Sequence, residues 1–339
     1  KAYGWNYKFE NDFAGQTDSV SCAAQSITVP EPVPPATTVS ISKPAQTCDG
    51  NAGRGFREMW IGTKVYGANL RIGQAKPYRS MEELTSSNEI LFMERPFSSA
   101  SGLYRQFQLG AFLDGAGKNW GWGVSAYNLK AAQDNETDGF GSSARVYYAP
   151  VMTDANVLHL GLSGGIDNPA NNQSVSVAGL RYGGRSGPSA SLGAATIEEQ
   201  TSYGIEVAGK AGAFYGQAEY AIAEFGEELV DDEEVNSYYV QLSYLITGES
   251  KPYDVKKGVF KSPKPKGAGG AWEVKVRYDF ADAEEVSAES EVTQLAAGLN
   301  WFVNPNVRIM FEYISGEREP ETGSSQKLDA LTTRVQLAF

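Results

Sequence analysis

The sequence is poor in the features that mark membrane helices and metal sites. It contains a single histidine, His159, and two cysteines, Cys22 and Cys48. It has no uninterrupted apolar run of about 18 residues, the length that crosses a bilayer as a helix. The missing run excludes a helical membrane protein. One histidine and two distant thiols do not supply a ligand set, so we expect no metal ion and no cofactor.

What the sequence does contain is alternation with a period of two residues. From Trp272 to Phe280, apolar or aromatic side chains occupy every even position and charged side chains every odd one. The C-terminal stretch 331–339 alternates in the same way and ends on the aromatic Phe339. Successive side chains of a strand face opposite sides, so one face of these strands suits lipid and the other suits water. This pattern is typical of outer-membrane β-barrel strands.

A soluble β-sandwich is the alternative, because its strands also alternate. Its water-facing strands rarely carry Trp and Tyr at both ends, however, and rarely run this long. Here the pattern recurs near 5–9, 238–244 and 307–313 with no break in composition. We therefore predict one all-β domain over 1–339, a transmembrane antiparallel β-barrel in the bacterial outer membrane. We also expect a processed chain, because a barrel must be exported before it inserts.

The alternating stretches predict about fourteen strands, with boundaries good to a few residues. They lie near 3–13, 56–66, 69–75, 105–114, 120–130, 140–149, 155–165, 202–210, 213–224, 236–247, 271–281, 293–303, 307–315 and 330–339. Short and long connectors alternate between them. Short periplasmic turns and long extracellular loops are the usual arrangement in outer-membrane barrels.

The longest candidate loop is 15–54, which is rich in proline. Prolines at positions 30, 32, 34 and 35 cannot donate hydrogen bonds to a central sheet. We expect an external loop closed by a disulfide between Cys22 and Cys48, which an extracytoplasmic compartment permits. In the loop-entropy picture this bond stabilises the fold by roughly 3 kcal/mol.

Four stretches of the sequence carry a family resemblance. They are 82–95 (EELTSSNEILFMER), 244–253 (YLITGESKPY), 270–278 (GAWEVKVRY) and 298–306 (GLNWFVNPN). Their sequence, order and spacing resemble the phosphate-selective porin O and P family, across the chain outside 15–54 and most clearly from residue 202 onward. The resemblance implies trimers of barrels with about sixteen strands and an inward-folded third loop that narrows the pore.

The strand count from the pattern is two short of that family type. A first hairpin before Trp5 would supply two strands, or the segment 166–201 hides them, where 174–182 and 189–197 alternate weakly. The third alternative is a barrel that closes with fourteen strands. Edges left open in lipid cost several kcal/mol per unpaired group, so we expect one of these solutions to hold.

The segment 76–104 is the candidate constriction loop, because it is long and highly charged. Channels select ions by charged rings at a narrowing. We expect three arginines to face three acids across the pore: Arg79, Arg95 and Arg105 against Glu82, Glu83 and Glu94. Strand parity adds further cations to the lumen: Arg71, Arg145, Lys275, Arg277, Arg308 and Arg334. The alternative for 76–104 is a solvated surface loop.

One departure from the family bears on the solute. By resemblance, phosphate-selective members carry a lysine just before the Thr-Ser-Ser run, whereas this chain has Leu84 there and Asn88 just after the run. An oxyanion needs charge-assisted donors to replace its hydration, and leucine supplies none. We therefore predict a porin for passive diffusion of small hydrophilic solutes or ions, with mild anion selectivity. The alternatives are a phosphate- or polyphosphate-specific channel and a structural or adhesin barrel with a plugged pore.

The expected surroundings follow from the barrel and the resemblance. We expect lipid bilayer and lipopolysaccharide as partners, a homotrimer, small solutes or ions in transit, and no nucleic acid. Acidic residues crowd 224–234 and 282–291, which is typical of a solvated face or of divalent-cation bridging to lipopolysaccharide. We expect no enzymatic activity, because the only histidine, His159, has an inward position rather than one on the rim.

Overall fold

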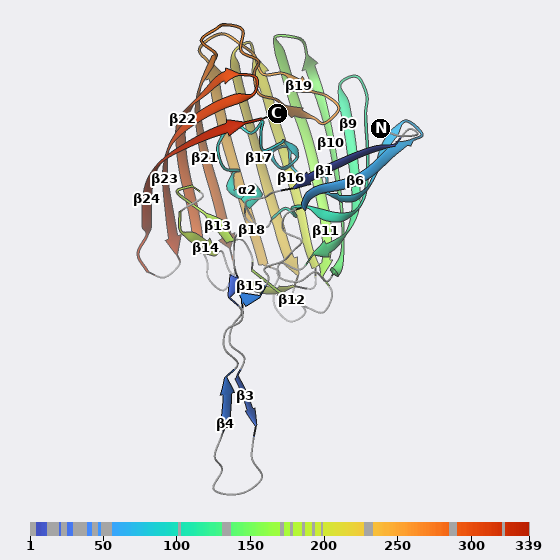
Figure 1. Cartoon of the computed structure of the whole chain (residues 1–339), viewed down its shortest axis with the longest axis vertical. Coiled ribbons are helices and arrows are strands. Elements are labelled where there is room, and N and C mark those ends of the chain that lie inside the picture. Colours follow the sequence, from blue (N-terminus) through green and yellow to red (C-terminus); the bar gives the residue numbers. More distant parts are fainter. Residues whose placement is uncertain are drawn as a thin grey trace, which may run out of the picture.

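The main sheet accounts for most of the chain. The structure is a computed structural model that describes residues 5–11, 20–21, 26–29, 39–42, 47–48, 56–100, 103–130, 137–169, 173–176, 179–184, 187–191, 194–197, 199–226, 233–284, 290–320 and 323–338. Figure 1 shows the long strands side by side in a sheet that curves round an interior, with α2 and neighbouring chain inside it.

The sheet contains fourteen antiparallel strands, as the alternation predicts. Its strands, in spatial order, are β1 (Asn6–Asn11), β6 (Phe56–Val65), β7 (Ala68–Ala75), β8 (Gln108–Ala116), β9 (Trp120–Lys130), β10 (Thr137–Met152), β11 (Asn156–Pro169), β16 (Glu199–Ala211), β17 (Phe214–Gly226), β18 (Glu233–Leu245), β21 (Ala271–Glu284), β22 (Ser290–Asn304), β23 (Val307–Pro320) and β24 (Gln326–Leu337). Each strand pairs with the next long strand of the chain. This meander is the topology of an up-and-down barrel wall.

The two faces of the sheet differ as the sequence pattern predicts. On β21, Val274 and Val276 are each 40 % exposed, whereas Glu273 is fully buried and Lys275 is 4 % exposed. The same alternation of exposed apolar and buried polar side chains runs along β11, β16, β17 and β18. An apolar exterior around a polar interior is the opposite of a soluble fold and suits a wall between lipid and an interior that holds charged groups.

The outward face supports a first prediction. Replacing Val276 by arginine should destabilise the folded protein in lipid by about 2–4 kcal/mol, because a charge would then lie on the lipid face near the middle of the bilayer. The check is the unfolding midpoint in urea after folding into lipid vesicles. Val276→Leu is the control and should leave the midpoint unchanged; equal stability of the arginine variant would mean that this face does not meet lipid.

Several short strands lie outside the main sheet. β12 (Gln173–Ser176) pairs with β15 (Ala194–Ile197), and β13 (Gly179–Arg181) pairs with β14 (Ser189–Ser191). The alternative that 174–197 supplies two further barrel strands is therefore wrong, because its strands pair with each other and not with the wall. Their short ladders are typical of a loop that folds on itself.

The proline-rich segment 15–54 also contributes only small sheets. β2 (Val20–Ser21) pairs with β5 (Thr47–Cys48), and β3 (Ser26–Val29) pairs with β4 (Val39–Ser42), apart from the main sheet (Figure 1). The predicted disulfide lies outside the described residues, since Cys22 is not among them. It stays a prediction.

The sheet order begins at β1 and ends at β24, and within the described residues no backbone pairing joins these two strands. Both strands lie on the near side of the sheet in Figure 1, with β24 at the left, β1 toward the right and α2 visible between them. We call the gap between them the seam. It exposes one hydrogen-bonding edge on each side, which is the feature that barrels normally remove by closure.

Two helical turns, α1 (Met81–Leu84) and α2 (Phe97–Ala100), lie in the connection between β7 and β8. Among the described residues, no helix is long and apolar enough to cross a membrane. The interior also holds a short hairpin, formed by β19 (Tyr253–Asp254) and β20 (Val259–Phe260) in the connection between β18 and β21. Both inserted segments contain buried side chains, such as Met81 and Phe260.

Candidate pore constriction

The connection between β7 and β8 folds into the interior. We call residues 76–107 the inward segment; residues 101–102 of it are not described. Met81 is fully buried, and Glu82 and Phe92 are each 1 % exposed. Ser80 lies at the start of α1 and accepts a hydrogen bond from the backbone N–H of Glu83 at 3.2 Å. Such burial is uncommon for a long connection between adjacent strands and requires partners for its backbone groups.

A carboxylate on the opposite wall holds the first turn of α1. Glu219 of β17 accepts hydrogen bonds from the backbone N–H groups of Met81 at 3.0 Å and Glu82 at 2.8 Å. The hydroxyl of Tyr239 donates to the same carboxylate at 2.6 Å. Free N–H groups at a helix start are satisfied by such acceptors. The inward segment is therefore fixed across the width of the interior.

A second anchor joins the segment to the wall near β9 and β11. Arg79 Nη2 lies 3.0 Å from Asp167 Oδ1 and 2.6 Å from the hydroxyl of Tyr127. Arg105 Nε lies 3.0 Å from the second oxygen of Asp167. A Cβ at Gly165 would come within 2.3 Å of Arg79 Nη2, so glycine at this wall position makes room for the guanidinium.

A third anchor uses the last strands of the sheet. Lys275 donates to the carbonyl of Leu91 at 3.0 Å and pairs with Glu312 at 2.5 Å. Further wall arginines reach carbonyls of the segment: Arg308 donates to Ile90 at 2.8 Å and Arg277 donates to Glu94 at 2.9 Å. Arg334 of β24 pairs with the Glu94 carboxylate at 2.6 Å. Cations of the wall thus bind oxygen atoms of the inward segment.

These contacts place many of the predicted lumen cations in structural roles. Arg79, Arg145, Lys275, Arg277 and Arg308 are between 1 and 4 % exposed. Each has a carboxylate or carbonyl partner, and a charge in a low-dielectric interior is tolerated only with such partners. The wall cations face inward, where the backbone of the inward segment covers Lys275, Arg277 and Arg308. The β19–β20 hairpin covers Arg145 instead.

The expected arrangement of arginines on one side and acids on the other is not what the structure shows. Glu83 lies 2.5 Å from Lys76 and 3.9 Å from Arg95, all on the same segment. Burial raises the pKa of Glu83, but Lys76 and Arg95 outweigh it and hold the pKa below its usual range. Burial lowers the pKa of Lys76 by more than Glu83 raises it. When opposite charges pair within one segment, each buried charge has a close partner. The desolvation penalty is therefore smaller than for two separate rows of like charges facing each other across the pore.

Arg71, another of the predicted lumen cations, lines a cavity inside the barrel wall. Arg71 of β7 lies within 6 Å of the ring centres of Trp60, Tyr78 and Phe112, at 5.5, 5.4 and 5.8 Å, and 3.4 Å from Asp114. Arg71 thus stacks against aromatic faces while staying part-exposed, as guanidinium groups often do.

The hairpin β19–β20 enters the interior from the turn side, which the alternation pattern does not predict. Arg145 of β10 donates to the carbonyls of Lys257 at 2.9 Å and Gly258 at 2.8 Å. His159 lies between Tyr253 of the hairpin, whose hydroxyl is 2.7 Å from Nδ1, and the wall carboxylate of Glu206, 2.8 Å from Nε2. One feature of the sequence does indicate this inward turn: the apolar pair Val259 and Phe260 lies inside a lysine-rich connector.

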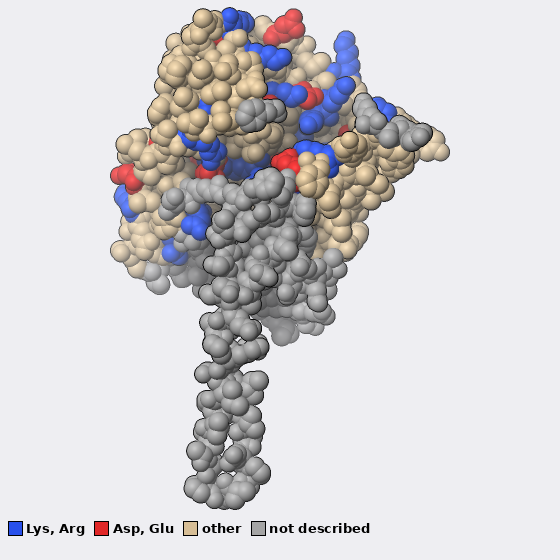
Figure 2. Space-filling model, viewed as in Figure 1, with Lys and Arg blue, Asp and Glu red and all other residues tan. Residues whose placement is uncertain are grey.

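Three cavities remain open beside the inward segment, and they form a row. Cavities of about 420 and about 290 Å³ share the lining residues Lys8, Glu58, Lys76, Leu84 and Lys257. The second of these shares Arg57, Ser87, Arg95 and Gln106 with a cavity of about 600 Å³ on the long-loop side. We call this row the passage. Figure 2 shows Lys, Arg, Asp and Glu side chains gathered on the hollowed face above the grey region.

The passage lies against the first strands of the sheet rather than at its centre. Its lining includes β1 and β6 on one side and Arg334 and Gln336 of β24 on the other, so it runs along the seam. Leu84 borders two of the three cavities, and Asn88 borders the third. Arg57 and Glu58 are lining residues that the sequence pattern does not reveal, since only the fold brings β6 to face the inward segment.

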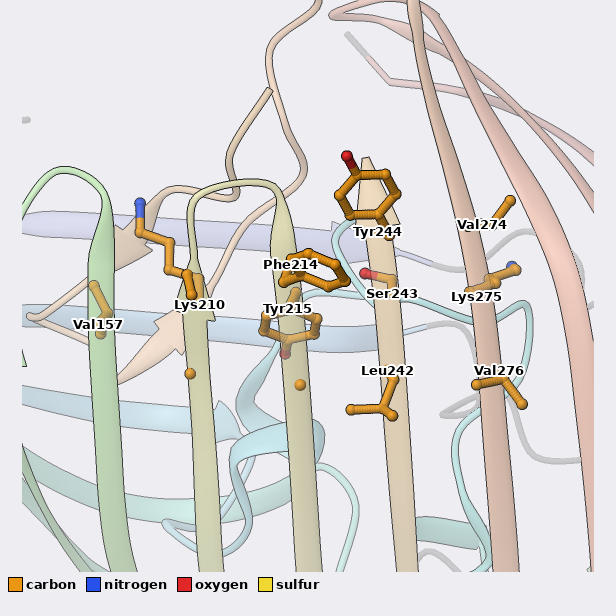
Figure 3. A pocket seen from close by; sticks show the side chains of 13 residues that line it. Val157, Lys210, Phe214, Tyr215, Leu242, Ser243, Tyr244, Val274, Lys275 and Val276 are labelled. Atoms are coloured by element: carbon orange, nitrogen blue, oxygen red, sulfur yellow. The ribbon is translucent and has the colours of Figure 1, made fainter. Parts of the chain in front are cut away.

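A further cavity, of about 620 Å³, lies on the outer face near the turn side. Figure 3 shows Phe214, Leu242, Tyr244, Val274 and Val276 around it, on neighbouring strands. These side chains are between 38 and 63 % exposed and belong to the apolar exterior. The cavity is a depression of the lipid-facing surface and is separate from the passage.

Comparison with known proteins agrees with this architecture. The family model of the phosphate-selective porin O and P matches residues 1–339. Porin O of Pseudomonas aeruginosa is 28 % identical over 308 residues, which cover 80 % of this chain and 70 % of that protein. An uncharacterised protein of Caulobacter vibrioides is 30 % identical over 239 residues, 64 % of this chain and 47 % of that one.

Solved structures show the same fold. OmpT of Vibrio cholerae in a trimer form has a TM-score of 0.51 at 12 % identity, over 97 % of each chain. Another structure of the in-vitro folded protein has a TM-score of 0.50 at 10 % identity, over 82 % of this chain and 77 % of that one. Because the family match spans its whole length, the chain belongs to the phosphate-selective porin O and P family and is a β-barrel porin of the bacterial outer membrane.

Proposed function

We propose that the chain is a channel for passive diffusion of small hydrophilic solutes and ions, with mild anion selectivity, and that solutes cross it through the passage along the seam. The observation that carries the proposal is the charge of the lining. Twelve Lys or Arg residues and seven Asp or Glu residues line the three cavities. An excess of cations in a narrow, low-dielectric conduit attracts anions and repels cations.

Pairing limits the strength of that selectivity. Lys8 lies 2.8 Å from both Glu10 and Glu58, and Lys76 is paired with Glu83. Paired cations contribute less potential than isolated ones. Lys256 and Lys257 of the turn-side hairpin are exposed and have no ion pair among the residues described. They supply much of the net positive field at the turn-side end of the passage.

Replacing these two lysines tests the proposal. We expect Lys256→Gln with Lys257→Gln to lower the chloride-to-potassium permeability ratio by about twofold, because the uncompensated charge at the turn-side end is removed. The measurement is the reversal potential of single channels in planar bilayers under a potassium chloride gradient. Lys64→Gln is the matched control, since Lys64 is an exposed lysine that lines none of the three cavities. An unchanged ratio in the double variant would place the permeation path elsewhere.

The phosphate-specific alternative has one observation in its favour. Ser86, Ser87 and Arg95 line the middle cavity with Lys76, and hydroxyl, guanidinium and ammonium groups are donors that oxyanions accept. Leu84 argues against this alternative, because it lines the same cavity and supplies no hydrogen-bond donor to an anion. A plugged structural or adhesin barrel remains the third alternative, and absence of any single-channel current would favour it over both channels.

We also propose a homotrimer in a bilayer that contains lipopolysaccharide. The family and the trimer form of OmpT support the trimer, and the apolar exterior supports the bilayer. The mass of the protein in mild detergent tests the assembly, and a monomeric mass would count against it.

A further inference from the structure

The tip of the turn-side hairpin is a tight turn between β19 and β20. The N–H groups of Lys257 and Gly258 both donate to the carbonyl of Asp254, at 3.1 and 2.8 Å. Lys256 and Lys257 lie in this turn and line the cavity of about 420 Å³ in the passage. The ladder of β19 and β20 has only two residue pairs, and an isolated hairpin is at best marginally stable in water. The tip therefore depends on the wall for its position.

An arginine of the wall holds the backbone of this tip. Arg145 of β10 donates to the carbonyls of Lys257 at 2.9 Å and Gly258 at 2.8 Å, one from each terminal nitrogen of its guanidinium group. On the same strand, the Tyr147 hydroxyl donates to the carbonyl of Val255 at 2.8 Å. The wall thus fixes the backbone at residues 255, 257 and 258, while the side chains of the two lysines remain exposed.

The charge of Arg145 itself is compensated within the wall. Its Nη2 lies 2.7 Å from Glu206 Oε1, and its Nε lies 2.9 Å from the same oxygen. Both side chains are buried. An opposite charge this close cancels most of the potential that a cation would exert at longer range. Arg145 borders the cavity of about 420 Å³, but it therefore contributes little field of its own to a solute there.

Glycine at the tip allows this close contact with the wall. Gly258 has a φ of 62°, in the left-handed region that favours glycine. A Cβ at this position would lie 2.8 Å from three ring carbons of Tyr147. The Tyr147 ring also stacks on the buried ring of His159, with centroids 5.5 Å apart, so it has little room to move aside. Any larger residue at position 258 would push the tip away from the wall.

We propose that Arg145 is a positioning residue for anion selectivity. It fixes the hairpin tip against the wall, so that the ammonium groups of Lys256 and Lys257 stay beside the passage and their field acts on the solute. Arg145 acts through these two lysines and does not bind the solute itself. In 0.1 M salt the potential of a charge is screened within about 10 Å, so a tip that leaves the wall weakens the anion preference. The inference rests on the proposed function, because it requires solutes to cross through the passage.

Two substitutions that conserve charge test the inference. Arg145→Lys keeps a cation beside Glu206 but loses the planar fork that reaches two carbonyls. Gly258→Ala changes no charge and forces a clash with Tyr147, and it serves if the first variant folds poorly. We expect each variant to lower the chloride-to-potassium permeability ratio by up to about twofold, because the two lysines then lie farther from the solute. The measurement is the reversal potential of single channels under a potassium chloride gradient.

A matched control and a combined variant separate positioning from other effects. Gly212→Ala is the control, because Gly212 has a φ of 59° and no described atom lies within 4 Å of the added Cβ. It carries the same backbone strain without touching the hairpin, and the ratio should stay unchanged. The combined variant adds Arg145→Lys to Lys256→Gln and Lys257→Gln. It should have the same ratio as the lysine double variant, because no charge is left at the tip for Arg145 to position.

The outcomes distinguish this inference from the proposed function. If the lysine double variant lowers the ratio but folded Arg145→Lys and Gly258→Ala channels keep that of the unmodified protein, the positioning role is overturned and the proposed function stands. A further fall of the ratio in the combined variant also overturns it, since Arg145 would then act on the solute independently of the lysines. If the lysine double variant itself leaves the ratio unchanged, the proposed function fails and the inference fails with it.

Discussion

Replacing Leu84 by lysine should add phosphate block of the chloride current. Leu84 borders two of the three cavities of the passage, next to Lys76 and Ser86 of the inward segment. A lysine there would add a cation, beside existing donors, to the smallest of the three cavities. We expect the phosphate concentration for half block to fall by about tenfold or more, since charge-assisted hydrogen bonds replace the hydration of the anion.

The measurement is single-channel chloride current with phosphate added to one side. Leu84→Met is the control, because it keeps the volume and adds no charge, and it should leave the block unchanged. A different outcome would be informative as well. If the unmodified channel is already blocked by micromolar phosphate, roughly 8 kcal/mol of binding, then Ser86, Ser87, Lys76 and Arg95 form a phosphate site despite Leu84, and the proposal of mild selectivity is wrong.

Removing the Lys275 ammonium should loosen the inward segment and widen the passage. Lys275 holds the carbonyl of Leu91 and pairs with Glu312, which also accepts from the N–H of Met93 at 2.8 Å. In Lys275→Met, Glu312 becomes a buried carboxylate without its cation, and breaking such a pair costs about 3–5 kcal/mol. We expect a lower thermal midpoint together with higher and noisier single-channel conductance.

A second substitution distinguishes the loss of the pair from a general loss of packing. Lys275→Met combined with Glu312→Leu removes both charges, and the thermal midpoint should largely recover, because replacing a whole buried pair with apolar groups is often nearly neutral. Conductance should stay raised, since the Leu91 and Met93 contacts are still missing. If the single variant keeps both the midpoint and the conductance of the unmodified channel, the inward segment is held by its other anchors alone.

The architecture was predictable because the alternation expresses a physical boundary. Lipid on one side and polar groups on the other impose a period of two on every strand, and all fourteen strands were found by that signal. Strand ends were harder to predict. β10 covers Thr137–Met152 rather than 140–149, because backbone pairing continues beyond the bilayer, where side chains no longer need to alternate.

The candidate site was less predictable for a different reason. Strand parity predicts that Lys275 and Arg308 face inward, but their partners are the backbone carbonyls of Leu91 and Ile90. Because every residue has a backbone carbonyl, the sequence does not show which carbonyls accept these hydrogen bonds. The position of the passage depends on which wall strands the inward segment leaves uncovered. That choice is made by long-range packing, so the roles of Arg57 and Glu58 could not be inferred from local pattern.

The anchors of the inward segment also constrain the order in which the protein can fold. Arg308 and Ile90 are 218 positions apart in the chain, and Met93 and Glu312 are 219 apart. Contacts between such distant residues form late, because a long stretch of chain must be ordered first. β23 must therefore be in place before residues 90–93 acquire their final partners. Until then their carbonyls face water, and the nascent barrel has a wider opening than the mature protein.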